Sequence, residues 1–228
     1  KYPLVLVAPG DIELVWDGGE VKRKFFDTLL SQLDREYLGH LIVYQANLKH
    51  RNGLLRMAAG QPNIDRELLA TYDERLVTSG QWLYARRAAF VKQLIPRVQE
   101  HYAFLVNGVN EVPGISYTSH LDTLDFAKEL IDRLDGDLLL GRTSVGVHRD
   151  EFRFTLNDNE LKTFGSQGQQ KSFLIALKLS EFDLLSEING FKPLLLLDDI
   201  FDKLDDERIV QLLKLVADGS FGQIFLTD

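Results

Sequence analysis

The sequence predicts an α/β fold with a long helical hairpin inserted into it, and three observations carry this prediction. Two long stretches repeat apolar residues every three or four positions, as amphipathic helices do. Beyond Gly141 the apolar period changes to two, which is typical of strands. The wholly apolar run Leu194–Leu197 is followed directly by two aspartates, which indicates a buried strand that ends in charged residues.

Composition narrows the class of protein. The 228 residues are 45% hydrophobic and 26% charged, the formal net charge is −8, and cysteine is absent. Disulfides and thiolate metal sites are therefore excluded. The negative charge disfavours indiscriminate coating of nucleic acid, although a local basic patch would suffice for a DNA site. No apolar run approaches the roughly 18 residues of a membrane span, so we expect no membrane partner. The absence of cysteine is compatible with a reducing cytoplasm, where we expect the protein.

The first part of the chain predicts a short strand and then a helix. The strand covers residues 2–7. A helical period begins at Glu20, and Asp34 is placed to cap a break within it. The apolar seam of this helix consists of Phe26, Leu30, Leu33, Tyr37, Leu41, Tyr44, Leu48 and Leu55.

A second helix is expected after a stop signal at residues 59–63. Arg87 interrupts its seam, and Pro96 is expected to kink or end the helix. Two long helices joined by a short loop lie antiparallel, so we infer a hairpin, with two ordinary helices of a bundle as the alternative. The seam consists of Leu68, Tyr72, Leu76, Leu83, Phe90, Leu94 and Val98.

The remainder of the chain alternates between helices and strands. A helix over 122–140 is expected to end at Gly141. The other expected elements are a loop at 108–114 leading to a strand through Tyr117, a strand at 144–147, a hairpin of 152–156 and 161–164 around a turn at 157–159, a helix at 169–188, and strands at 194–197 and 223–227.

Two aspartates mark the first candidate site. Asp198 and Asp199 directly follow the predicted strand Leu194–Leu197, at the edge where open α/β sheets bind ligands. Ionised carboxylates are costly there unless a cation or hydrogen-bond donors compensate them. Mg²⁺ with nucleotide phosphates is the commonest compensation. A strand followed by an Asp-capped turn is the alternative.

A polar run marks the second candidate site. Ser166-Gln167-Gly168-Gln169-Gln170-Lys171 follows the predicted hairpin and opens a helix. Free N–H groups and the helix dipole make such a start an anion site. A polar loop with an N-cap serine is the alternative. Leu204-Asp205 then follows Asp199, and Thr227-Asp228 ends the last predicted strand.

In this order and spacing, the motifs resemble the latter half of an ABC-type ATPase head, namely signature loop, Walker B strand, D-loop and switch strand. Three departures resemble the RecF family in particular: Gln167 in place of a glycine, Asp199 in place of a glutamate, and Thr227 or Asp228 in place of a switch histidine. Further resembling segments are Val7–Val15, Lys22–Asp27 and Gly146–Glu151.

The resemblance implies residue roles. Asp198 would bind Mg²⁺, and Asp199 would be the catalytic carboxylate. The nucleotide would be contacted by Ser166, Gln167, Gly168, Gln169, Gln170, Asp205 and Thr227, and DNA by Lys22, Arg23 and Lys24. ATP and Mg²⁺ are expected on the complete protein and not on this chain alone, because the sequence contains no Walker A pattern.

The resemblance also implies a function. The complete protein would bind DNA in an ATP-dependent manner during recombinational repair, replication-gap processing and the SOS response, with weak DNA-dependent ATPase activity. It would form an ATP-dependent homodimer and act with single-stranded or gapped DNA, RecR and RecO. Residues 1–18 and 141–228 would belong to the head and 19–140 to a helical arm, and we expect both chain ends to be truncations. An ABC transporter ATPase subunit and a non-catalytic helical scaffold are the alternatives.

Two charged groups allow more than one interpretation. His148-Arg149-Asp150 is either a structural salt-bridge cluster or a group that senses nucleotide or joins the lobes. Arg86 and Arg87, like the basic run Lys22-Arg23-Lys24, either lie on a solvated helix face or contact DNA phosphates.

Overall fold

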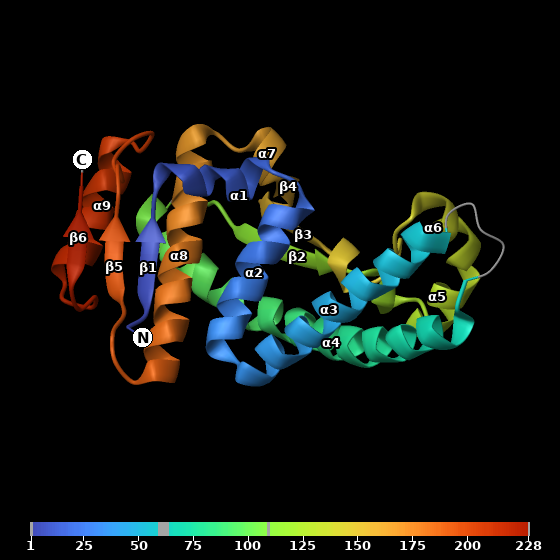
Figure 1. Ribbon diagram of the computed structural model, residues 1–228. Helices are drawn as coiled ribbons and strands as arrows, with labels where there is room; N and C mark the ends of the chain where they lie inside the picture. The colour runs from blue at the N-terminus through green and yellow to red at the C-terminus, as the bar shows by residue number, and fades with distance from the viewer. Residues whose placement is uncertain (1, 59–63, 109, 228) are drawn as a thin grey trace. The chain divides into compact units, whose positions relative to one another are not determined.

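The computed structural model describes residues 2–58, 64–108 and 110–227 (Figure 1). They form two compact units, one of residues 1–25, 90–116 and 152–228, and the other of 26–89 and 117–151. These units differ from the expected division into 1–18, 19–140 and 141–228. Residues 90–106, which were expected in the helical arm, belong to the same unit as the two chain ends. The stop signal at 59–63 lies outside the described residues.

The first unit contains a parallel sheet in the order β1 (Leu4–Val7), β5 (Leu194–Leu197) and β6 (Ile224–Leu226). Alternate residues of the first two strands are buried, namely Val5, Val7, Leu195 and Leu197. Helix α8 (Gln167–Asn189) packs beside β1 (Figure 1). The predicted strand Leu194–Leu197 is therefore confirmed, and Asp198 and Asp199 stand at its carboxyl end.

Shorter elements connect this sheet to the rest of the unit. They are a 3₁₀ turn (Pro9–Ile12), α1 (Glu13–Trp16), the start of α2 (Gly19–Leu33), α7 (Leu161–Phe164) and α9 (Asp206–Ala217). A second sheet has the order β2 (Pro113–Thr118), β3 (Glu151–Leu156) and β4 (Asn159–Glu160). The turn between β3 and β4 has positive φ at Asn157 and Asp158, as a two-residue hairpin requires.

The second unit is built on α3 (Arg35–Ala58) and the first part of α4 (Arg66–Val106). Tyr37 lies beside Trp82 and His50 stacks on Tyr72, so the two helices run antiparallel and form the expected hairpin (Figure 1). Asp34 separates α2 from α3, and its Oδ1 accepts the backbone N–H of Glu36 at 2.9 Å, which confirms the predicted cap. The remaining helices are a 3₁₀ turn (His120–Asp122), α5 (Phe126–Asp132), α6 (Leu134–Leu140) and a 3₁₀ turn (Val147–Arg149).

Two predicted helices differ from the observed ones. Helix α4 continues ten residues past Pro96, because Leu94 and Val98 on either side are buried and their packing outweighs one lost hydrogen bond. The helix expected over 122–140 is divided at Arg133, where φ is −93° and ψ is 1°. Gly141 ends α6 in the left-handed conformation, as predicted.

Two predicted strands are wrong. Residues 144–147 form a loop leading to a 3₁₀ turn, because Gly146 has φ of 125° and lies so close to Tyr44 that a Cβ would stand 2.5 Å from its hydroxyl. Residues 161–164 form the short helix α7 instead of a return strand. The side-chain Nε2 of Gln170 donates to the carbonyls of Leu161 and Gly165, which satisfies the end of this helix. Among the described residues, the helices lack a stretch that is both long and apolar enough to cross a bilayer.

Candidate nucleotide-binding site

Ser166 begins helix α8 with a complete capping box. Its Oγ accepts the backbone N–H of Gln169 at 3.2 Å, and its own N–H donates to Oε1 of Gln169 at 2.7 Å. The serine hydroxyl hydrogen is not used by these two bonds and can donate to a bound oxygen. The N–H groups of Gln167 and Gly168 occupy the first helical positions, where no carbonyl of the helix itself can accept them. The helix start therefore offers several donors to an anion.

The glutamines of the signature loop (Ser166–Gln169) and the next residue have different environments. Gln167 is exposed, whereas Gln170 is buried and its amide points back to α7. Gln169 is also engaged, since its Nε2 donates to Oε1 of Glu111 at 2.7 Å. The side chain of Gln167 therefore remains exposed, while the amides of Gln169 and Gln170 hold the loop itself.

Gly168 lies where the signature loop meets the segment after β5. A Cβ at this position would stand 3.0 Å from Nη1 of Arg208 and 3.2 Å from the carbonyl oxygen of Lys203. A larger residue would push the two segments apart, so glycine permits this close approach.

Asp198 and Asp199 lie at the carboxyl end of β5 and are exposed. Oγ1 of Thr227 donates to Oδ1 of Asp198 at 2.5 Å and accepts the backbone N–H of Asp199 at 3.2 Å. Asp199 has a φ of 48°, which is uncommon for a residue with a side chain. Nζ of Lys171 donates to its carbonyl oxygen at 3.1 Å. Thr227, at the end of the last strand, and Lys171, on helix α8, therefore both hold the backbone of Asp199.

Asp205 is the N-cap of helix α9, six residues after Asp199. Its Oδ1 accepts the backbone N–H of Arg208 at 2.9 Å, and its Oδ2 accepts from Nη1 of the same arginine at 2.8 Å. The chain turns toward this cap through Lys203, which has a φ of 64°. Asp205 thus lies in a turn that Arg208 fastens and that faces Gly168.

Together these residues fit a nucleoside triphosphate that carries a hard cation such as Mg²⁺. The oxygen of an exposed carboxylate such as Asp198 is a ligand that Mg²⁺ prefers, and the cation usually keeps phosphate and water oxygens as its other ligands. The donors at the start of α8 fit phosphate oxygens. Asp199 presents a second carboxylate beside the first, suited to accept a proton from water.

The predicted DNA contacts lie on the first two turns of α2. The ammonium of Lys22 stands 4.9 Å from the ring centroid of Phe154, so it packs on an aromatic face. Arg23 is half-buried and Lys24 is exposed. A role of these three residues in DNA binding stays a prediction.

Arg87 corrects the interpretation of the Arg86-Arg87 pair as a surface feature. It is 2% exposed, and its guanidinium donates to Asp27 and Asp150, each at 2.8 Å, and to the carbonyl of Val147. Arg86 is half-exposed and pairs with Asp34 at 2.9 Å. Arg87 is therefore available neither to solvent nor to DNA phosphates.

Asp150 and His148 belong to polar networks of the second unit. Asp150 is buried, pairs with Arg87 and accepts a hydrogen bond from Tyr117. Burial raises the pKa of Asp150, although Arg87 opposes that shift. Nε2 of His148 donates to the carbonyl of Thr143 at 3.1 Å, and its Nδ1 lies 2.8 Å from the hydroxyl of Tyr44. These contacts favour the structural interpretation of the cluster.

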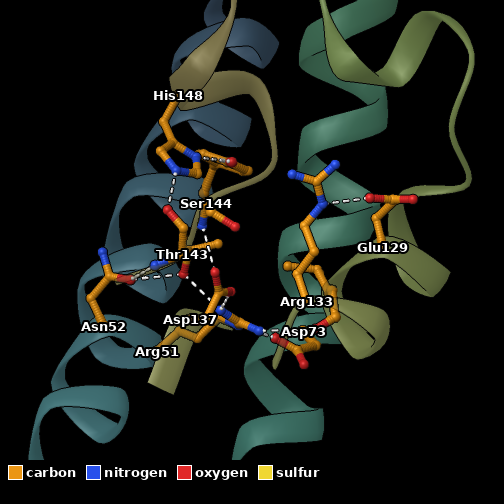
Figure 2. A network of polar contacts seen from close by, with 11 residues as sticks. Arg51, Asn52, Asp73, Glu129, Arg133, Asp137, Thr143, Ser144 and His148 are labelled. Carbon is orange, nitrogen blue, oxygen red and sulfur yellow. Dashed lines mark hydrogen bonds and ion pairs between the residues drawn. The ribbon is translucent and has the colours of Figure 1, made fainter. Parts of the chain in front are cut away.

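A related network surrounds Arg51, which is fully buried (Figure 2). Its guanidinium donates to Asp73 at 2.6 Å, to Asp137 at 2.7 Å and to the hydroxyl of Thr143 at 2.9 Å. Nothing in the helical seam predicted this group, since an arginine between apolar positions also suits a solvated helix face.

Three residues beside the candidate site had no assigned role. Lys171 was visible as the end of the polar run, and Arg208 stands three residues after an N-cap aspartate, a spacing that favours an ion pair. Glu111 had no local signal, because its partners in this site, Gln169 and Arg208, are 58 and 97 residues away in the sequence.

Known proteins are similar to this chain along its whole length. The DNA replication and repair protein RecF of Cytophaga hutchinsonii is 43% identical over 228 residues, which cover 100% of this chain and 60% of the relative. The RecF proteins of Flavobacterium johnsoniae and Bacteroides thetaiotaomicron are 41% and 42% identical over 99% of this chain, and over 63% and 60% of their own lengths. The chain thus spans about three fifths of these relatives.

Solved structures agree with the curated relatives. Structures described as the recombination mediator protein RecF-ATPrS and RecF-ATP in the RecFOR pathway each match with a TM-score of 0.85 and 30% identity, over 99% of this chain and 62% of theirs. No protein-family profile matches the chain. The similarity confirms the predicted α/β fold. The chain belongs to the RecF family of DNA replication and repair proteins.

Proposed function

We propose that this chain is the signature and Walker B part of an ATP-dependent DNA-binding protein of recombinational repair and replication-gap processing. The observation that carries the proposal is the meeting of two segments at one sheet edge. Lys171 of α8 donates to the carbonyl of Asp199, and Gly168 lies against the carbonyl of Lys203. The family membership adds support, since the relatives are named for DNA replication and repair.

The start of α8 would read the terminal phosphate of a nucleotide held by a second copy of the complete protein. The Ser166 hydroxyl and the N–H groups of Gln167 and Gly168 are donors that a triphosphate would engage and a diphosphate would not reach. A ligand shifts an equilibrium only by its difference in affinity between two states. ATP would therefore favour a dimer and ADP would release it.

The carboxylates would act at the other side of the same nucleotide. Asp198 would hold Mg²⁺, which supplies charge neutralisation of the phosphates when bound. Asp199 would orient the attacking water and accept its proton. Its backbone is held by Thr227 and Lys171, which would keep the carboxylate in one position during turnover. The complete protein would be a weak DNA-dependent ATPase.

The partners of the complete protein are part of the same proposal. Single-stranded or gapped DNA would bind to the nucleotide-loaded dimer, and proteins of the RecO and RecR type would act with it. The basic start of α2, with Lys22, Arg23 and Lys24, is our candidate for a phosphate contact.

Ser166→Arg in the complete protein tests the proposal. A bulky cation at the helix start blocks the approach of a phosphate, so we expect each monomer to bind ATP normally while ATP-dependent dimerisation is lost. Sedimentation velocity with and without a slowly hydrolysed ATP analogue measures this directly.

The control for this variant is Ser220→Arg. Ser220 is exposed and precedes strand β6. Because β5 and β6 are parallel, Ser220 lies at the end of the sheet opposite to Asp198 and Asp199, which follow β5. The control should dimerise as the wild type does. A full dimer in Ser166→Arg would mean that the loop is only a capped helix start, and the proposal would be wrong.

A further inference from the structure

Glu111 joins two segments of the first unit that are far apart in sequence. Its side chain is 12% exposed. Oε1 accepts Nε2 of Gln169 in the signature loop at 2.7 Å, and Oε2 lies 3.6 Å from Nη2 of Arg208 at the start of α9. Oε2 also accepts the hydroxyl of the buried Tyr102 at 2.5 Å. One carboxylate therefore contacts the signature loop, the turn after Asp205 and helix α4.

The contact with Gln169 controls the signature loop through the orientation of an amide. A carboxylate only accepts hydrogen bonds, so it fixes the Nε2 of Gln169 toward itself. The opposite end of the amide, Oε1, is thereby turned toward the N–H of Ser166 and completes the capping box. Without Glu111 the amide could reverse, and Ser166 would then face a donor.

The contact with Arg208 controls the turn at Asp205 through charge. Arg208 is 14% exposed, and within the described chain its Nε is buried without an acceptor. Its charge is balanced by Asp205 at 2.8 Å and by Glu111. Its Nη1 is also the group nearest to Gly168. The guanidinium thus lies between the turn and the signature loop, and Glu111 holds it there.

We propose that Glu111 is a positioning residue that holds the signature loop and the turn of Asp205–Arg208 in one fixed arrangement for the partner's nucleotide. The proposal rests on the proposed function and adds to it a residue outside all of the motifs. Glu111 acts through Gln169 and Arg208. Its loss should weaken the closed dimer while the ATP affinity of each monomer stays unchanged.

Glu111→Ala in the complete protein is the first test. A charge-assisted hydrogen bond of about 1.5–3 kcal/mol corresponds to about a tenfold or hundredfold change in an equilibrium constant, so we expect dimerisation with an ATP analogue to weaken at least about tenfold. Turnover at saturating ATP should fall, and the ATP affinity measured on monomers should not change. Arg208→Ala should behave alike, and the double variant should be little worse than either single variant, because the two residues act as one group.

Glu111→Gln separates the contact with Gln169 from the contact with Arg208. It also tests the proposal if Glu111→Ala fails to fold. Its carbonyl can still accept Nε2 of Gln169, but the charge opposite Arg208 is gone, so we expect a dimer weaker than wild type and stronger than Glu111→Ala. The matched control is Asp183→Asn on α8, far from the signature loop, which removes the carboxylate charge that faces Nε2 of His101 at 2.6 Å. This control should leave the dimerisation midpoint unchanged.

The outcomes separate the two proposals. If the wild-type protein does not dimerise with the analogue, the proposed function fails and the role of Glu111 fails with it. If the wild type dimerises, Ser166→Arg does not, and Glu111→Ala dimerises at the wild-type concentration, only the role of Glu111 is wrong. A shift of the midpoint in both Glu111→Ala and Asp183→Asn would also overturn it, since any loss of packing on α8 would then have the same effect.

Discussion

The hydroxyl of Thr227 donates to Oδ1 of Asp198 at 2.5 Å, from the strand next to the one that carries the aspartate. The same oxygen accepts the backbone N–H of Asp199, so its hydrogen must point to Asp198. Two neighbouring strands therefore fix the orientation of one carboxylate and the backbone of the next residue.

Thr227→Val should slow ATP hydrolysis by the complete protein. Valine keeps the shape of threonine but removes both hydrogen bonds, so we expect kcat to fall about tenfold, as for the loss of one or two polar contacts. Thr227 is exposed, so the melting temperature should hardly change. Steady-state ATPase assays and thermal melts measure the two effects, with Thr227→Ser as the control that retains the hydroxyl. Wild-type turnover in the valine variant would show that this contact does not serve the reaction.

Asp199→Asn should stop turnover and leave nucleotide binding intact. Asparagine tolerates the left-handed backbone at φ of 48°, so this substitution removes the base without straining the loop. Loss of a general base costs about a hundredfold or more in rate. The closed dimer should accumulate in ATP, which light scattering follows over time. Hydrolysis at the wild-type rate would remove Asp199 from the role of catalytic carboxylate.

Arg51→Met should destabilise the second unit strongly. Asp137 is fully buried and would lose its guanidinium partner at 2.7 Å, and an uncompensated buried charge costs about 3–5 kcal/mol. Arg86→Met is the matched control, because its partner Asp34 lies near the surface and such pairs contribute less than about 1 kcal/mol. Urea unfolding of both variants compares the two costs. Equal losses would contradict the assignment of Arg51 as a buried anchor.

Glu181 should make stability depend on pH. Burial raises the pKa of Glu181 above its ordinary value of 4.5, although Lys178 at 3.6 Å opposes the shift and Asp11 adds to it. A raised pKa means that the folded state holds the proton more tightly. The resulting stability is complete below pH 4.5 and is lost as the pH rises through the folded pKa.

Glu181→Gln tests this dependence, because glutamine resembles the protonated acid at every pH. The melting temperature of the wild type, relative to the variant, should therefore be higher near pH 4.5 than at neutral pH. Parallel melts across this range measure the difference. A difference that stays constant would mean that Glu181 does not change its proton affinity on folding.

Local signals sufficed for some elements. The strand Leu194–Leu197 was bounded by its own apolar run, and Ser166 and Asp34 acted as helix caps where their positions predicted them. In each case the deciding interaction is between residues a few positions apart. The position of the apolar run also predicted Asp198 and Asp199 at the carboxyl edge of a parallel sheet.

Contacts distant in sequence decided the rest. The loop at Gly146 follows from the closeness of Tyr44, which lies on helix α3. The role proposed for Glu111 depends on Gln169 and Arg208, which a reading of nearby residues cannot connect. An inward glutamine and an outward one also look alike in a polar run, so Gln170 and Gln167 could not be distinguished by sequence.

The guanidinium of Arg51 has a mechanical consequence for the helical hairpin. An apolar seam that repeats every three or four residues can slip by one turn and still find apolar partners. Arg51 cannot slip with it, because a shift of one turn would carry its charge away from both Asp73 and Asp137. Helices α3 and α4 are thus prevented from ratcheting past each other by one turn.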